Sequence, residues 1–258
     1  MRWNHLLPAV VLSATACAGG SPTQPGPDPS ITPPFSGTIF IDPDIILPSD
    51  PTSFTSIAYV GRGDRTMFDR RINGWVTLNA FLFDAVYDNG AIIEVQVNPE
   101  FVTEGASQVE ADHYAEVIGR LPVALRADVE TVWIHRGVEP FGGGNNNLLI
   151  HTGQGEIYER DGILEETFVH EAAHTSLDAA HRVASGWVAA QDADPTFIST
   201  YARDFPQRED IAESMVPYIA VRYRQDRVSA ALRARIESTI PHRLAYLDGL
   251  LMDMHPIS

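Results

Sequence analysis

The stretch VHEAAHTSLDAAH, residues 169–181, holds three histidines, one glutamate and one aspartate within thirteen residues. Its alanines and other apolar residues recur at a period that is typical of an α-helix. On a helix, His170 and His174 lie on one face because they are four residues apart, with Cβ atoms about 5–6 Å from each other. Two imidazoles at that spacing can bind one metal ion, and Glu171 beside them can reach a water molecule on the ion without binding the ion. The spacing therefore predicts a metal site on a helix, with an acid–base group next to it.

A catalytic zinc site usually has three protein ligands, so the stretch is one ligand short. The metzincin pattern requires a histidine ten residues after the first one, where this chain has Ala180. His181 comes one residue later, which turns it by about 100° from the face of the other two histidines, so we do not expect it to be a ligand. Asp178 lies four residues after His174 on the same face, where it can accept a hydrogen bond from a ligand imidazole. A solvated aspartate is the alternative interpretation of Asp178.

A second acidic segment, STYARDFPQREDIAES, spans residues 199–214. Pro206 marks a helix start, and Glu209 and Glu213 are four residues apart in the first turns. Taken alone, the two glutamates are typical of carboxylates that stabilise a helix N-terminus. Residues 170–174, HEAAH, match the HExxH motif. Combined with this motif, the segment resembles the gluzincin family of zinc peptidases, in particular the catalytic domain of anthrax lethal factor. The position of Asp178 after the motif is similar to that in thermolysin-like enzymes.

The resemblance implies roles for three residues of this segment. Glu209 would be the third zinc ligand, Glu213 would accept a hydrogen bond beside a ligand, and Tyr201 would donate one to the transition state. The resemblance also implies a zincin-like fold. It covers only the motif helix and residues 199–214.

The remaining pattern predicts an α+β fold, in which a short mixed sheet precedes the motif helix and the C-terminal part is mainly helical. Asn89-Gly90 between two apolar runs predicts a type I′ hairpin turn that joins strands at 80–87 and 91–97. Further strands are expected at 37–41, 55–60, 129–135 and 148–152, with 156–158 as a partner of the last one. A loop is expected at 141–147, and helices are expected within 104–121, 162–180, 185–190, 208–223 and 229–251, the last interrupted near Pro241.

Two parts are expected in the folded chain, a β-rich N-terminal subregion at 37–98 and a catalytic region at 99–258. In the catalytic region, residues 148–152 are expected to form an edge strand on which an extended peptide pairs through main-chain hydrogen bonds. The residues of this strand assigned to the substrate are Leu148, Leu149, Ile150 and His151. The glycine run at 142–144 is expected to flex over the cleft, or simply to connect two strands.

The N-terminus predicts export. Arg2 supplies a positive start, residues 6–12 are an apolar run and small residues follow, which is typical of a secretory signal peptide and too short to span a membrane. Cys17, directly after the small residues, resembles the lipidated cysteine of a bacterial lipoprotein signal. That resemblance implies a signal at 1–17 and a lipid anchor at the bacterial cell envelope; an ordinary cleaved signal peptide is the alternative. Residues 18–36 are rich in proline and are expected to form a disordered tether.

The composition bounds the partners. The net charge of −16 argues against nucleic acid, because phosphate binding requires clustered basic residues. An acidic surface could favour cationic peptides, although solubility is the simpler explanation. The single cysteine excludes an intrachain disulfide.

Together these features predict a peptidase with one Zn²⁺ ion and a peptide or protein substrate. His170, His174 and Glu209 would bind the ion, Glu171 would be the general base and Tyr201 would stabilise the oxyanion. Two alternatives stay open: a non-catalytic surface lipoprotein that keeps the zincin scaffold as a binding module, and a zinc amidohydrolase that acts on cell-wall peptides. The intact Glu171 argues against a purely structural metal site.

Overall fold

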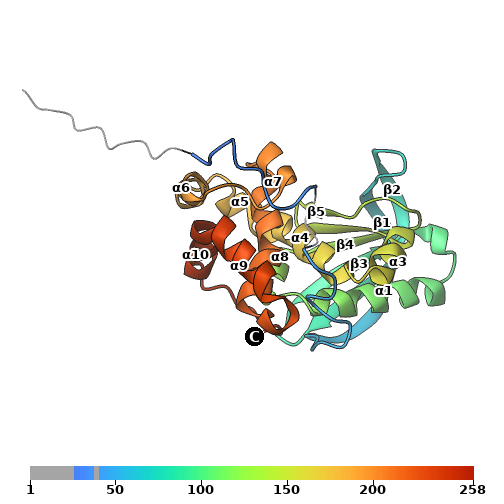
Figure 1. The fold of residues 1–258 in the computed structure, drawn as a ribbon. Coiled ribbons are helices and arrows are strands. Elements are labelled where there is room, and N and C mark those ends of the chain that lie inside the picture. The colour runs from blue at the N-terminus through green and yellow to red at the C-terminus, as the bar shows by residue number, and fades with distance from the viewer. Residues whose placement is uncertain (1–25, 38–40) are drawn as a thin grey trace, which may run out of the picture.

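The structure is a computed structural model that describes residues 26–37 and 41–258 (Figure 1). The expected signal peptide, Cys17 and the first part of the expected tether lie outside these residues, as does most of the strand expected at 37–41. No helix within the described ranges has the length and apolar character needed to cross a membrane.

The described strands form one mixed six-stranded sheet with the order β1-β2-β3-β4-β6-β5. The strands are β1 (Phe54–Asp69), β2 (Gly74–Tyr87), β3 (Ile92–Val97), β4 (Thr131–His135), β5 (Gly142–Gly144) and β6 (Asn147–His151). β1 to β3 are antiparallel neighbours, β3, β4 and β6 run parallel, and β5 returns antiparallel to β6. The expected β-rich subregion at 37–98 therefore belongs to the same sheet as the strands near the motif helix.

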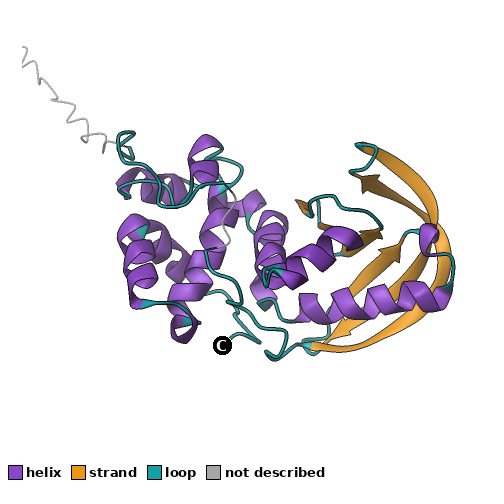
Figure 2. Cartoon of the chain, turned by 45° about the vertical axis from the view of Figure 1, so that its right-hand side comes forward, coloured by secondary structure: helices purple, strands orange, loops and turns teal. Residues whose placement is uncertain are grey.

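Helices cover one side of the sheet and extend beyond it. They are α1 (Glu104–Gly119), α2 (Val123–Arg126), α3 (Thr152–Arg160), α4 (Leu164–Ser176), α5 (Asp178–His181), α6 (Ser185–Ala193), α7 (Thr200–Asp204), α8 (Asp210–Arg222), α9 (Ala230–Thr239) and α10 (Pro241–Gly249), with 3₁₀ turns η1 (Pro99–Phe101) and η2 (Gln225–Arg227). Figure 2 shows α1 lying across the curved sheet, while the C-terminal helices gather at one end. The molecule is thus an α+β fold, as predicted.

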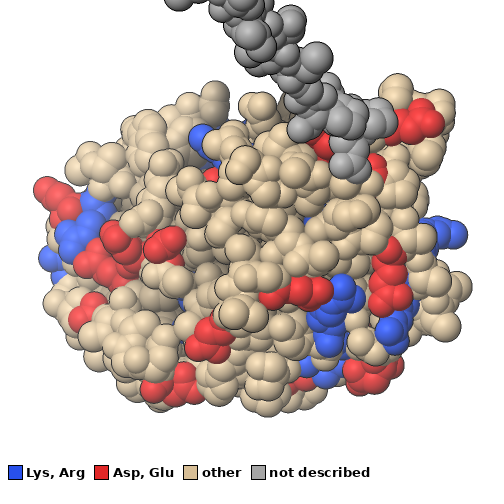
Figure 3. All heavy atoms as spheres, turned by 90° about the vertical axis from the view of Figure 1, so that its left-hand side faces the viewer, with Lys and Arg blue, Asp and Glu red and all other residues tan. Residues whose placement is uncertain are grey.

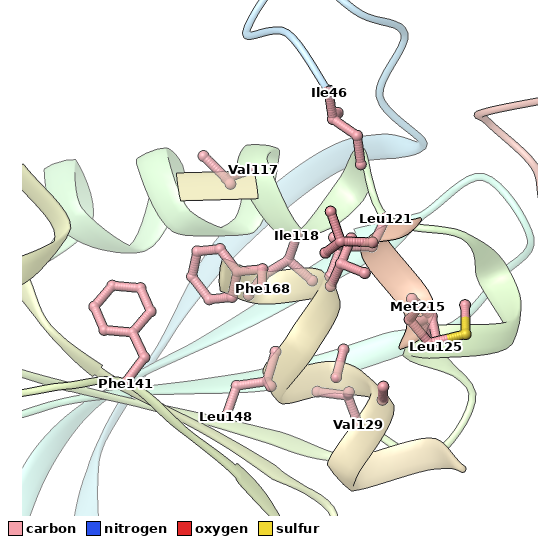
Figure 4. Packing of buried hydrophobic residues seen from close by; sticks show 14 of the residues in the cluster. Ile46, Val117, Ile118, Leu121, Leu125, Val129, Phe141, Leu148, Phe168 and Met215 are labelled. Atoms are coloured by element: carbon pink, nitrogen blue, oxygen red, sulfur yellow. The ribbon is translucent and has the colours of Figure 1, made fainter. Parts of the chain in front are cut away.

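The core lies between the sheet and the helices α1 and α4. Alternate residues of β2 and β3 are buried on this side, which follows the two-residue period of a strand. Figure 4 shows Phe141 and Leu148 rising from the sheet towards Phe168 on α4 and Ile118 on α1. The Phe141 and Phe168 ring centroids are 5.1 Å apart, and all four side chains are buried. This packing fixes α4, the helix of the HExxH motif, against the sheet.

The turn between β2 and β3 differs from the predicted type. Gly90 has a φ of 82°, but Asn89 is not among the described residues with positive φ. The amide of Gly90 donates to the carbonyl of Tyr87, and the amide of Tyr87 donates to the carbonyl of Ala91. The connection is therefore a longer turn that ends in a left-handed glycine, and the type I′ prediction was wrong.

The expected edge strand is an interior strand. β6 lies between β4 and β5, and the residues assigned there to the substrate, Leu148, Leu149, Ile150 and His151, are all buried. The edge is formed by β5, where a loop was expected. A Cβ atom on Gly143 would lie 1.8 Å from the carbonyl oxygen of Glu171, so only glycine lets this strand approach α4 so closely.

Two other expectations were wrong. Residues 156–158 are part of α3 and not a strand, and part of the expected tether is packed. The amide of Thr200 donates to the carbonyl of Phe35, and the hydroxyl of Thr196 donates to the carbonyl of Ile31. Residues 28–37 therefore lie along 195–200, the segment that leads into α7.

Candidate metal centre

Two helices bring three metal-binding side chains together. His170 and His174 project from α4, and Glu209 is the N-cap residue directly before α8. The Nε2 atoms of the two histidines are 3.2 Å apart. The Oε2 atom of Glu209 lies 3.1 Å from Nε2 of His174 and 3.5 Å from Nε2 of His170. The three atoms form a nearly regular triangle.

The triangle matches the ligand spacing of a tetrahedral zinc ion. Zn–N and Zn–O bonds of about 2.0–2.1 Å imply ligand atoms about 3.3 Å apart at the corners of a regular tetrahedron. Two imidazole nitrogens and one carboxylate oxygen are also the donor set of many catalytic zinc sites, which leave the fourth position open. Within the described part of the chain, His170, His174 and Glu209 are a buried group that could bind a metal ion.

A carboxylate lies behind each imidazole. Nδ1 of His174 is 2.9 Å from Oδ2 of Asp178, one turn further along the chain. Nδ1 of His170 is 3.5 Å from Oε1 of Glu213, whose other oxygen accepts a hydrogen bond of 2.6 Å from the hydroxyl of Ser199. The hydrogen bond to Asp178 can orient the His174 imidazole so that Nε2 faces the other candidate ligands, whereas His170 and Glu213 are only at ion-pair distance. Asp178 therefore lies beside His174, and Glu213 lies beside His170.

Charges in the group favour a cation. Burial lowers the pKa of His174, but hydrogen bonds to Asp178 and Glu209 outweigh burial and raise it to about 10. Burial raises the pKa of Glu209, but hydrogen bonds to His170 and His174, the charge of His174 and a hydrogen bond from Arg208 hold it far below its usual range. Glu209 is therefore a carboxylate at neutral pH, which is the form that binds a metal.

The second oxygen of Glu209 is held by two donors from outside α4. The Tyr201 hydroxyl donates to Oε1 over 3.1 Å, and Nε of Arg208 donates to the same atom over 2.7 Å. Nη2 of Arg208 also donates to the Tyr201 oxygen over 3.2 Å. Tyr201 therefore lies at the site, but its hydroxyl contacts the ligand carboxylate. The role of Arg208 could not be predicted from the sequence, because an arginine next to a helix start has no distinctive pattern.

A buried ion cluster fixes the start of α8. Arg243 on α10 donates to Asp210 over 2.8 Å and to Asp194 over 2.9 Å, and all three side chains are buried. Gln191 on α6 donates to Asp210 over 2.8 Å as well. Asp210 directly follows Glu209, so this cluster holds the third candidate ligand in place relative to α6 and α10.

The side chains of His170, His174 and Glu209 line an open pocket of about 970 Å³. Glu171 lines it from α4 and is half-buried, and the edge strand β5 lines it through Gly143 and Gly144. His181 does not belong to the group, because its Nδ1 lies 2.8 Å from the hydroxyl of Tyr246 on α10.

Comparisons with protein-family models, curated proteins and solved structures find no match for this chain.

Proposed function

We propose that this protein is a zinc-dependent peptidase with a zincin-like fold of the gluzincin type. The proposal rests on one observation above all: the Nε2 atoms of His170 and His174 and the Oε2 atom of Glu209 are spaced as ligands of one tetrahedral ion. Their place in an open pocket beside Glu171 favours a catalytic site over a structural one, because a structural site needs neither feature.

A zinc ion held by these residues would polarise a peptide carbonyl and lower the pKa of a water molecule. The carboxylate of Glu171 is the group placed to move protons there. It adjoins the first ligand in the sequence, faces the pocket and receives no hydrogen bond from another described residue. It would accept a proton from the attacking water and pass it to the amine nitrogen, as the C–O bond forms and the C–N bond breaks. General acid–base catalysis of this kind contributes typically about 10²–10⁴-fold to the rate.

Tyr201 and Arg208 line the pocket and contact the candidate ligand Glu209. In the structure, Tyr201 donates to Glu209 Oε1, which Arg208 also holds. If the Tyr201 hydroxyl turned to the substrate, Arg208 would still donate a hydrogen bond to Oε1 of Glu209. The hydroxyl could then stabilise the developing oxyanion. We keep this role for Tyr201 as part of the proposal.

The edge strand for an extended peptide would be β5 in place of 148–151. Edge strands offer unpaired main-chain groups to a peptide, and β5 lines the pocket beside Glu171. Its residues, Gly142–Gly144, have no side chains that would block a peptide from pairing.

The test combines metal analysis with a digest of a broad peptide library. We expect about one zinc ion per chain in the purified protein, and cleavage that stops when a chelator removes the metal. Zinc without cleavage of any peptide would favour the binding module, and cleavage of only cell-wall peptides would favour the amidohydrolase. Protein that binds no zinc would contradict both enzyme proposals and leave the binding module, which needs no metal.

A further inference from the structure

The basic residues of this chain are unusual in number and in type. All 18 are arginines, against 34 acidic residues. Most of the described arginines form an ion pair with an aspartate or glutamate, and in Figure 3 the larger groups of basic side chains lie directly beside acidic ones. The described arginines outside any ion pair are Arg62, Arg70, Arg126, Arg136, Arg182 and Arg235.

Two of these arginines, Arg70 and Arg182, line the pocket of the candidate metal centre. Arg70 directly follows β1, and its Nη2 donates to the main-chain carbonyl of Phe141 over 2.9 Å, which does not neutralise its charge. Arg182 follows α5 and is exposed, and its side chain forms no hydrogen bond or ion pair with another described residue. The chain has nearly two acidic residues for each arginine, so carboxylates to pair with Arg70 and Arg182 are not scarce. The two guanidinium groups nevertheless form no ion pair with another described residue.

The acidic side chains of the pocket do not neutralise them either. Glu209 faces the two histidines and Arg208, and Asp178 is bonded to His174. Glu171 is the general base of the proposed reaction. A peptide in the pocket would therefore meet a metal ion and two guanidinium groups that have no carboxylate partner.

We infer that the pocket selects peptides that carry carboxylates close to the cleaved bond, and that Arg182 and Arg70 are the residues that bind them. A guanidinium pairs with a carboxylate through two parallel N–H···O bonds, which gives direction as well as strength. This selection is the opposite of what the net charge of −16 favours, because it depends on two arginines of the pocket and not on the charge of the whole chain. The inference rests on the proposed peptidase function.

The experiment compares peptides that differ in one carboxylate. N-acetylated, C-amidated octapeptides with Glu at one position around the cleaved bond are paired with the same peptides carrying Gln or Arg there. We expect kcat/KM to be about 10-fold higher for the Glu peptide at one or two positions, as one charge-assisted hydrogen bond provides. A third set with a free C-terminus separates a side-chain carboxylate from a terminal one. Equal rates for Glu and Gln, or faster cleavage of Arg peptides, would overturn the inference.

Variants assign the effect to residues. Arg182→Gln and Arg70→Gln should each lower the preference for Glu over Gln, measured as the ratio of kcat/KM values in the same variant, to about 3-fold or less. Arg235→Gln is the matched control, since Arg235 is also an exposed arginine without an ion pair, but on α9 and outside the pocket. Because the side chain of Arg182 is exposed and forms no hydrogen bond or ion pair with another described residue, its replacement tests recognition with the main-chain hydrogen bond to Asp178 kept. Preference that survives in both pocket variants would contradict the assignment.

Binding separates this inference from the proposed function. Fluorescence anisotropy with labelled Glu and Gln peptides can be measured on Glu171→Gln, which should bind without cleaving. Tighter binding of the Glu peptide that is lost in Arg182→Gln would support the inference even if the wild type cleaved nothing. Cleavage by the wild type without any such preference would leave the peptidase proposal standing and refute the inference alone.

Discussion

Glu171 and Glu209 are carboxylates of the same pocket, but their neighbours give them different roles. Glu209 faces both imidazoles and is held by Arg208 and Tyr201, whereas Glu171 projects from α4 without such bonds. A group that binds a metal must be fixed, whereas a group that moves protons must be free to reach substrate. We therefore expect the two glutamates to respond differently to substitution.

Glu171→Gln should keep the zinc and lose the activity. The amide has the same shape as the carboxylate but accepts no proton, so kcat/KM should fall by about 10²–10⁴-fold at unchanged metal content. Glu209→Ala, measured beside it, should lower the zinc content, because one of three ligands is gone. A Glu171→Gln protein that cleaves as fast as the parent would refute the general-base assignment. Unchanged zinc in Glu209→Ala would refute Glu209 as a ligand.

Residues close together in the sequence could be related by helical spacing, whereas residues far apart in the sequence could not. His170, His174 and Asp178 recur every four residues, and the structure places them on one face of consecutive helical turns. Glu209 lies on another helix, and no spacing rule relates two helices, so only the resemblance to a family pointed to it. Arg70 comes to the pocket from the β1–β2 turn and could be found only from the fold.

At the scale of elements, α4 was predictable because it is long and its apolar residues are periodic. β5 and α3 were not, since both depend on their surroundings. Glycine is disfavoured in strands, but Gly143 is the residue that lets β5 lie against α4. The first turns of α3 contain Gly153 and Gly155, and there a Cβ atom would collide with Gly137 and Tyr114 respectively. In each case, close packing outweighs local preference.

α4 is also fastened to the segment before β1. Oε1 of Glu166 on α4 accepts a hydrogen bond of 2.9 Å from the amide of Ile46, and Ile46 is part of the buried core. Oε2 of Glu166 is buried and has no partner among the described residues. Burial is the main reason that the pKa of Glu166 is raised from 4.5 to about 8. The protonated carboxyl is thus the form that the folded protein prefers.

The contribution of Glu166 to stability should therefore fall as the pH rises from about 4.5 to about 8. In this window the unfolded chain releases the Glu166 proton while the folded chain keeps it, so rising pH favours unfolding. The slope from this group is at most about 1.4 kcal/mol per pH unit. Glu166→Gln keeps an acceptor for Ile46 and removes the titration, so its urea midpoint should change less with pH than that of the parent. Glu156→Gln, which replaces an exposed glutamate on α3, is the control. Parallel pH profiles of parent and Glu166→Gln would contradict the prediction.

At the scale of the whole molecule, the N-terminal segment connects the expected anchor to the pocket. Among the described residues of this segment, the amide of Asp28 donates to the carbonyl of Pro195, and the amide of Gly37 donates to the hydroxyl of Thr200. Thr200 directly precedes Tyr201 of the candidate site. Asp28 follows Cys17 by eleven positions (28 − 17), and an extended chain over eleven positions spans at most about 40 Å. If Cys17 carries lipid, the folded domain is held close to the membrane surface.

Cys17→Ser should therefore change where the protein is found without changing what it does. A thiol at this position is required for lipidation, so the variant should move from the membrane fraction to the soluble fraction of the cell envelope or to the medium. Its activity per molecule on a short peptide should stay the same, because residues 28–37 still pack against the segment before α7. Fractionation with immunoblotting, alongside a peptide assay of each fraction, measures both. Parent protein found in the soluble fraction would point instead to an ordinary cleaved signal peptide, and lost activity in the soluble variant would show that the anchor contributes to the folded site.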